Sequence, residues 1–300
     1  MILQCFTLKS LLKTLSIALS EKIELLKFLM LFRKHEQTKD NDILTVVTTI
    51  FLSVLFFGQI ALCSSSSTHF LKKGDRSFKE FDNRRAVQYY EGALEVDPTL
   101  NQRYEALWKI SRSLINVGEE IEGCPKKKIN YFERALEYSE KAIEIDPHRP
   151  WGYIQRASSN GRIAQCEGIW SSIKTINSVV DDIQKAIELD PENSTAHFMM
   201  GLIHLEISEK PYLFRLPIGL GWASSKQGIK AIKKSISLFP PRDPIQVRAH
   251  LRLAQAYLQK DKETRAIEEL EIALKLPMKD HQDMELRSKA KTIYNSQIRK

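Results

Sequence analysis

One nine-residue phrase occurs three times in this chain, and it constrains the fold more than any other feature. The copies are GALEVDPTL from Gly92, KAIEIDPHR from Lys141 and KAIELDPEN from Lys185. In each copy the apolar residues suit one face of a last helical turn. The Asp-Pro pair then ends the helix, because proline donates no backbone hydrogen bond and disfavours the α conformation in the preceding residue. Each copy therefore predicts a helix C-terminus.

These helix ends recur along most of the chain. The prolines are Pro98, Pro147 and Pro191, with weaker copies of the phrase ending at Pro240 and Pro277. Recurrence at intervals of a few tens of residues is typical of solenoids in which each unit is one helical pair. The sequence predicts an all-α protein, an α-α superhelix of about five such pairs.

The positions of small and aromatic residues indicate which repeat this is. Counting back from Pro98, the chain has Ala93, Tyr90, Ala86 and Gly74 at distances of 5, 8, 12 and 24 residues. This spacing resembles the tetratricopeptide repeat (TPR), in which small residues lie where two antiparallel helices cross and an aromatic residue packs from the second helix. The last predicted pair matches the same pattern at Leu253, Ala254, Tyr257, Ala266, Leu270 and Ala273.

Three predicted pairs are longer than a standard repeat, and their surplus falls between the first and second helix. The longest such segment runs from Pro211 to Trp222. Together with the stretch from Trp151 to Gly201, it resembles the regulator of microtubule dynamics family, a TPR family with membrane-anchored members. The chain departs from the family's YEGIK turn, which is CEGIW here. The resemblance implies a shared scaffold and, as an alternative function, basic patches that bind the acidic tails of tubulin.

An uncharged segment precedes the repeats, from Ile43 to Cys63. As a helix, roughly 20 such residues span about 30 Å of hydrocarbon. We predict a membrane or signal segment that either remains as an anchor or is cleaved after Cys63. Residues 1–42 form a basic or amphipathic lead, and translation could begin at Met1 or at Met30. The predicted organisation is lead 1–42, hydrophobic segment 43–63, TPR-like domain 64–277 and capping helix 278–300.

The lead segment carries a small excess of lysine and arginine over acidic residues. Because positive charge favours the cytoplasmic side of a membrane, this excess predicts a membrane-associated protein whose repeats are extracytoplasmic, in a periplasm or lumen. The alternative is a repeat domain on the cytoplasmic face of a membrane.

Charge and motif content limit the function classes. The net charge is +8, with basic runs at 125–128, 226–234 and the C-terminus. Aromatic residues are not interleaved with these runs, so nucleic acid is not a predicted partner. The sequence has no phosphate-binding glycine loop, nucleophile elbow or Cys-x-x-Cys pair. The spacing of His197 and His204 does not suit one metal ion. We therefore predict no enzyme activity, no cofactor and no metal site.

The predicted function is that of a scaffold that holds a partner protein. In TPR-like solenoids the concave groove is lined by the first helix of each pair, and here that lining is largely apolar with a basic edge. Such a groove suits a helix or extended peptide with apolar anchors; the alternative is that the lining packs against the C-terminal helix. The predicted groove residues are Leu71, Phe78, Trp151, Ile154, Arg162, Phe198, Leu205, Arg248, Leu251, Arg252, Gln255 and Gln259.

Overall fold

The computed structural model describes residues 66–123, 125–167, 173–240, 245–277 and 281–298. The chain divides into two compact units, Met1–Ile60 and Ala61–Lys300, and the described residues all belong to the second. The predicted lead 1–42 and hydrophobic segment 43–63 lie outside the described residues. Within the described ranges the secondary structure consists of helices and turns, without strands. The prediction of an all-α fold is confirmed.

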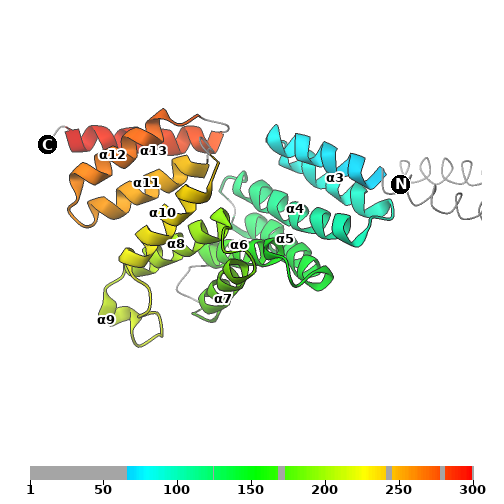
Figure 1. Cartoon of the computed structure of the whole chain (residues 1–300), viewed down its shortest axis with the longest axis horizontal. Helices are drawn as coiled ribbons and strands as arrows, with labels where there is room; N and C mark the ends of the chain where they lie inside the picture. Colours follow the sequence, from blue (N-terminus) through cyan, green and yellow to red (C-terminus); the bar gives the residue numbers. More distant parts are fainter. Residues whose placement is uncertain (1–65, 124, 168–172, 241–244, 278–280, 299–300) are drawn as a thin grey trace, which may run out of the picture. The chain divides into compact units, whose positions relative to one another are not determined.

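The helices follow one another as antiparallel pairs, and each packs on its neighbours in the sequence (Figure 1). A helix at 66–79 comes first, paired with α3. The labelled helices are α3 (Asn83–Glu95), α4 (Leu100–Glu119), α5 (Pro125–Ile145), α6 (Pro150–Glu167), α7 (Ile173–Leu189), α8 (Ser194–Ser208), α9 (Tyr212–Arg215), α10 (Ser225–Leu238), α11 (Ile245–Leu258), α12 (Glu263–Lys275) and α13 (His281–Ile298).

The Asp-Pro phrase ends helices as the sequence predicts. Helix α5 ends one residue before Asp146, and α7 ends one residue before Asp190. In both turns the aspartate also works as a side-chain acceptor. The Asp146 carboxylate accepts a hydrogen bond from the His148 N–H at 3.0 Å, and the Asp190 carboxylate accepts one from the Glu192 N–H at 3.3 Å. Such Asx turns reverse the chain directly into the next helix.

The small residues lie where two helices approach closely. A Cβ atom at Gly74 would lie 2.3 Å from the Tyr90 ring, a distance that no side chain tolerates. Tyr90 is fully buried there. In the fourth pair both helices carry glycine, and a Cβ at Gly201 would lie 3.0 Å from the Gly228 carbonyl oxygen. These contacts explain the residues on which the TPR resemblance rests.

The surplus residues are accommodated in two ways. In the second pair the helices themselves are long, since α4 has 20 residues and α5 has 21. In the fourth pair the surplus forms a loop with a one-turn helix, α9, between α8 and α10 (Figure 1). Between α6 and α7 the surplus falls partly on residues 168–172, outside the described residues.

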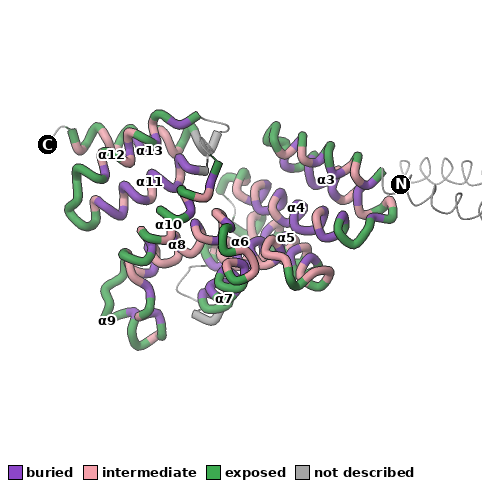
Figure 2. Tube along the Cα trace, viewed as in Figure 1, coloured by how far each residue is buried: buried purple, intermediate pink, exposed green. Residues whose placement is uncertain are grey.

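Buried residues lie along the paired helices and form several core clusters (Figure 2). At the C-terminal end, α13 packs against both α11 and α12, and Ala290 of α13 is fully buried. A search of the described residues for a helix long and apolar enough to cross a membrane found none.

Candidate functional site

We call the surface formed by the first helix of each pair (66–79, α4, α6, α8 and α11) the first-helix surface. The predicted groove residues all belong to these helices or to the residue that follows one. The structure buries five of the apolar ones in the core. They are Leu71, Ile154, Phe198, Leu205 and Leu251. Their side chains stabilise the helical pairs and leave little surface for a partner. Sequence spacing alone could not separate lining residues from core residues.

The other predicted groove residues retain solvent exposure. Gln259 is exposed, and the remaining ones are partly buried. They are Phe78, Trp151, Arg162, Arg248, Arg252 and Gln255. The Trp151 ring stacks on Trp108 of α4, with the ring centroids 4.8 Å apart. The first-helix surface is therefore more polar than the sequence predicts.

Ion pairs join successive first helices. Lys109 of α4 contacts Asp75 of the preceding first helix at 2.8 Å, and Arg162 of α6 contacts Glu119 of α4 at 3.2 Å. Arg252 of α11 contacts Glu206 of α8 at 2.9 Å. Two arginines predicted to face a partner thus pair within the protein. We call these three contacts the first-helix ion pairs.

Burial affects the charges in this series. It raises the pKa of the Glu206 carboxyl group, although the nearby Arg252 guanidinium acts in the opposite direction. Lys109 is almost fully buried, and its ammonium group also contacts Glu105 at 2.5 Å. A buried charge without a partner destabilises a fold. The main role of these contacts is therefore to stabilise the protein.

Arg112 of α4 forms no ion pair within the described residues, although Tyr90 and Asp75 interact with it electrostatically. The Arg112 guanidinium lies 3.5 Å from the centre of the Phe78 ring and 4.9 Å from that of Trp108. Burial lowers its pKa. The buried Arg112 Nε and Trp108 Nε1 donors lack a hydrogen-bond acceptor in the described structure. Arg112 was not predicted from the sequence, because nothing in its spacing distinguishes it from a surface arginine.

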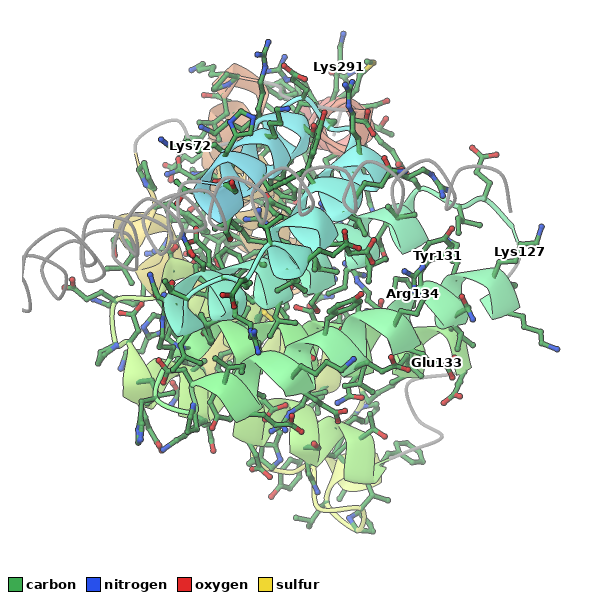
Figure 3. All side chains as sticks on the ribbon, turned by 90° about the vertical axis from the view of Figure 1, so that its right-hand side faces the viewer. Lys72, Lys127, Tyr131, Glu133, Arg134 and Lys291 are labelled. Carbon is green, nitrogen blue, oxygen red and sulfur yellow. The ribbon has the colours of Figure 1, made fainter. Side chains whose placement is uncertain are left out.

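The basic runs lie on helix surfaces away from these pairs. Helix α10 exposes Lys226, Lys230, Lys233 and Lys234, and none of them forms an ion pair with a described residue. At the start of α5, Lys127 points away from the body of the protein (Figure 3).

Further along α5, Tyr131 and Arg134 contact side chains of α3. Tyr131 accepts a hydrogen bond from Arg84 at 3.0 Å, and Arg134 lies 3.7 Å from Glu91. In Figure 3 the Tyr131 and Arg134 side chains lie near one another on α5. The exposed positive charge of the described residues therefore includes α10 and the first turn of α5, and also Lys72, Lys289 and Lys291.

Beside the α9 loop there is an open pocket of about 430 Å³. It is lined by Asn177, Val180, Asp181, Gln184, Met200, His204, Trp222 and Gln227. Val180, Met200 and Trp222 give this pocket an apolar lining beside the polar side chains. His204 Nδ1 accepts a hydrogen bond from the Ser224 N–H at 3.3 Å, and burial lowers the pKa of His204.

Paired helices with small residues at their crossings define a TPR protein. A thermophilic TPR protein of Thermus thermophilus has a similar solved structure, with a TM-score of 0.54 and 18% sequence identity over 77% of this chain and 98% of that one. The likeness shows the fold alone.

The family model "Regulator of microtubule dynamics protein 1-3" matches residues 70–297. The chain belongs to this family. Regulator of microtubule dynamics protein 3 of Rattus norvegicus is 26% identical over 189 residues, which cover 60% of this chain and 39% of the relative. Regulator of microtubule dynamics protein 1 of Bos taurus is 27% identical over 111 residues, which cover 37% of this chain and 35% of the relative.

The family corrects one prediction. The extracytoplasmic location that we predicted for the repeats is wrong, because the relatives are named as regulators of microtubule dynamics and microtubules are cytoplasmic polymers. The charge excess in the lead segment was too small to determine a topology. The names of the relatives support the alternative function that the sequence resemblance implied, in which basic patches bind the acidic tails of tubulin.

Proposed function

We propose that this chain is a non-catalytic binding module that attaches to microtubules through the lysines of α10. The names of its relatives motivate the choice of partner. The observation that carries the proposal is the exposure of Lys226, Lys230, Lys233 and Lys234 without an ion pair to any described residue. Unpaired cations on one helix attract an acidic partner, and the acidic tails of tubulin have that chemistry.

The helical spacing supports a single contact surface. Lys226 and Lys230 are four residues apart, as are Lys230 and Lys234, so these side chains share one face of α10. The nearest competing acid in the sequence lies well outside this helix, since residues 210–234 contain neither Asp nor Glu. The local sequence therefore supplies no acid to repel an acidic segment on α10, although Asp181 of α7 lines the same pocket as Gln227. Binding of this kind weakens as ionic strength rises.

Co-sedimentation of the full chain with microtubules tests this proposal. We expect the Lys230→Glu, Lys233→Glu double variant to lower affinity about tenfold, because charge reversal affects steering and rim contacts. The matched control reverses two lysines that already pair with glutamates. They are Lys185, 3.3 Å from Glu188, and Lys275, 3.9 Å from Glu271.

Both double variants change the net charge equally. Equal losses in the two would show that only total charge matters, and no loss in the α10 variant would exclude α10 as the site. Binding that does not weaken with added salt would contradict the proposal as a whole.

A second candidate function is peptide binding on the first-helix surface, as the sequence predicts. The supporting observation is the pair of partly exposed rings Phe78 and Trp151, which lie beside Arg112 and Trp108. An apolar residue of a peptide would contact the exposed parts of these rings. Its site would be distinct from α10.

Tryptophan fluorescence tests this candidate, because Trp108 and Trp151 stack at the site. A tubulin tail peptide is titrated into the full chain. Binding at the first-helix surface should change the signal, and Arg112→Met should abolish the change while Lys230→Glu leaves it intact. The reverse pattern would assign the peptide to α10.

A further inference from the structure

The loop that contains α9, residues 211–222, concentrates exposed apolar side chains. Five of the ten large apolar residues that are exposed in the described structure lie in it. Leu213 is 79% exposed and Phe214 is 75% exposed. Tyr212, Leu216 and Trp222 complete the group. In Figures 1 and 2 the loop projects from the ends of α8 and α10 with exposed residues along it. An exposed apolar group of this size marks an interaction site.

This loop has a fixed shape without a partner. The Arg215 side chain points inward and is only 7% exposed. It donates hydrogen bonds to the carbonyl oxygens of Lys210 at 2.8 Å, Leu220 at 3.2 Å and Ala223 at 2.8 Å. These charge-assisted bonds tie the two ends of the loop together. The neighbouring apolar side chains consequently point outward.

The end of the loop is also anchored. The Trp222 ring meets the His204 ring of α8 edge to face, with centroids 5.1 Å apart. Gly219 has a φ of 75°, a conformation that side chains rarely adopt. A preorganised projection of this kind suits a hollow of fixed shape on a folded partner, whereas a fluid lipid surface requires no particular shape.

The positive charge around the loop indicates that such a partner carries negative charge. From 210 to 234 the chain has six basic residues and no acidic ones. They are Lys210, Arg215, Lys226, Lys230, Lys233 and Lys234. Because Trp222 precedes the start of α10 by three residues, the apolar loop leads directly into the helix that carries the lysines. A partner that fits both has an apolar hollow beside acidic groups.

We propose that the α9 loop is a second, apolar contact with the microtubule, made with the folded body of tubulin rather than with its acidic tails. This inference rests on the proposed function. Leu213 and Phe214 enter a hollow between or within tubulin subunits, while the α10 lysines hold a tail. Tail binding depends on salt, whereas apolar burial does not weaken with ionic strength in the same way.

The experiment uses the full chain and two kinds of microtubule, intact ones and ones whose acidic tails have been removed by limited proteolysis. The wild-type chain should bind the tailless polymer more weakly but with little dependence on salt. Phe214→Glu should lower affinity for the tailless polymer about tenfold or more, as expected for an apolar anchor. Leu100→Glu is the matched control, because Leu100 of α4 is 70% exposed and far along the chain.

Two further variants protect the test against a folding defect. Leu213→Ser removes an exposed apolar side chain without adding charge, and it should act in the same direction as Phe214→Glu. Arg215→Lys keeps the charge but loses the forked donor, and it should weaken binding by loosening the loop. Circular dichroism should give wild-type melting for Leu213→Ser.

The outcomes separate the inference from the function on which it rests. If the wild-type chain binds neither polymer, the proposed function fails. If it binds intact but not tailless microtubules, the function stands and the inference is overturned. The inference is also overturned if Phe214→Glu and Leu100→Glu bind the tailless polymer equally. If Phe214→Glu binds both polymers as the wild-type chain does but binds phosphatidylserine-containing vesicles less well, the loop contacts lipid instead. That result would also overturn the inference.

Discussion

The first-helix surface and α10 both carry positive charge, but they use it differently. On the first-helix surface, Arg162 and Arg252 each contact a glutamate of the neighbouring pair. On α10 the lysines have no such partner among the described residues. Cations of the first kind join repeats to one another, and those of the second kind are available to another molecule. Net charge alone does not distinguish the two.

Among changes that test this comparison, we expect replacement of Lys109 to have the largest effect on the stability of the protein. Replacing Lys109 by Met leaves Asp75 and Glu105 without their shared cation. Because both acids are partly exposed, we expect a loss of about 2 kcal/mol in the free energy of unfolding, less than for a fully buried pair. Urea unfolding followed by circular dichroism measures it. Microtubule affinity should not change, and a parallel loss of affinity would show that Lys109 also binds the partner.

A smaller effect is expected for the Arg252–Glu206 pair. A double-mutant cycle with Arg252→Gln and Glu206→Gln should give a coupling of about 1 kcal/mol, since both side chains retain some solvent contact. The same cycle on Lys275 and Glu271, an exposed pair within one helix, should give about 0.3 kcal/mol. Similar coupling in both cycles would show that the first-helix pair has no special structural role.

His204 of α8, beside the α9 loop, makes stability depend on pH. Burial lowers the pKa of His204, so the folded state disfavours its protonated form. The unfolded chain therefore binds more protons below the ordinary histidine pKa, and stability falls as pH drops through and below that value. Melting temperatures at mildly acidic and neutral pH should reveal the loss.

His204→Phe removes the titrating group while retaining an aromatic ring against Trp222. The acid-induced loss of melting temperature should be smaller in this variant. The matched control is His197→Phe, at a partly buried histidine of the same helix, in which the acid-induced loss caused by His204 should persist. A similar change in both variants would exclude His204 as the source.

The smallest effect on stability is expected on α10. Lys226→Gln removes an exposed cation without a described ion-pair partner, so the free energy of unfolding should stay within about 0.5 kcal/mol. Binding to microtubules should nevertheless weaken and lose part of its salt dependence. Thermal melting with parallel co-sedimentation measures both. A clear loss of stability would mean that α10 uses its lysines structurally.

Much of the fold could be predicted from local residue chemistry. The Asp-Pro pairs end α5 and α7, and Gly74 lies against Tyr90, because helix termination and close crossings each require a few specific residues at fixed spacing. The position of the α9 loop could be predicted as an insertion, but its conformation could not. Its form depends on Arg215 reaching three carbonyl groups, and no sequence rule predicts that an arginine turns inward.

The site was harder to predict for a related reason. Leu71 and Leu251 occupy positions that face a groove in the repeat pattern, yet they are buried by their neighbours. Phe78 retains exposure at an equivalent kind of position because Arg112 covers it only in part. Burial at these positions depends on the side chains of the adjacent helical pair. The residue spacing within one repeat carries no information about those side chains.

The series of first-helix ion pairs has one interruption. No ion pair joins α6 to α8 in the described residues, but Arg162 of α6 attracts Glu206 of α8 electrostatically, and Ser158 donates a hydrogen bond to the Met199 sulfur at 3.6 Å. In a linear array each unit is held only by its neighbours, so partial opening begins at the weakest boundary. Where α6 meets α8, the helices α6 and α7 share an apolar core with Ala196 of α8, so the stability of this boundary should depend less on salt than that of the boundaries with ion pairs.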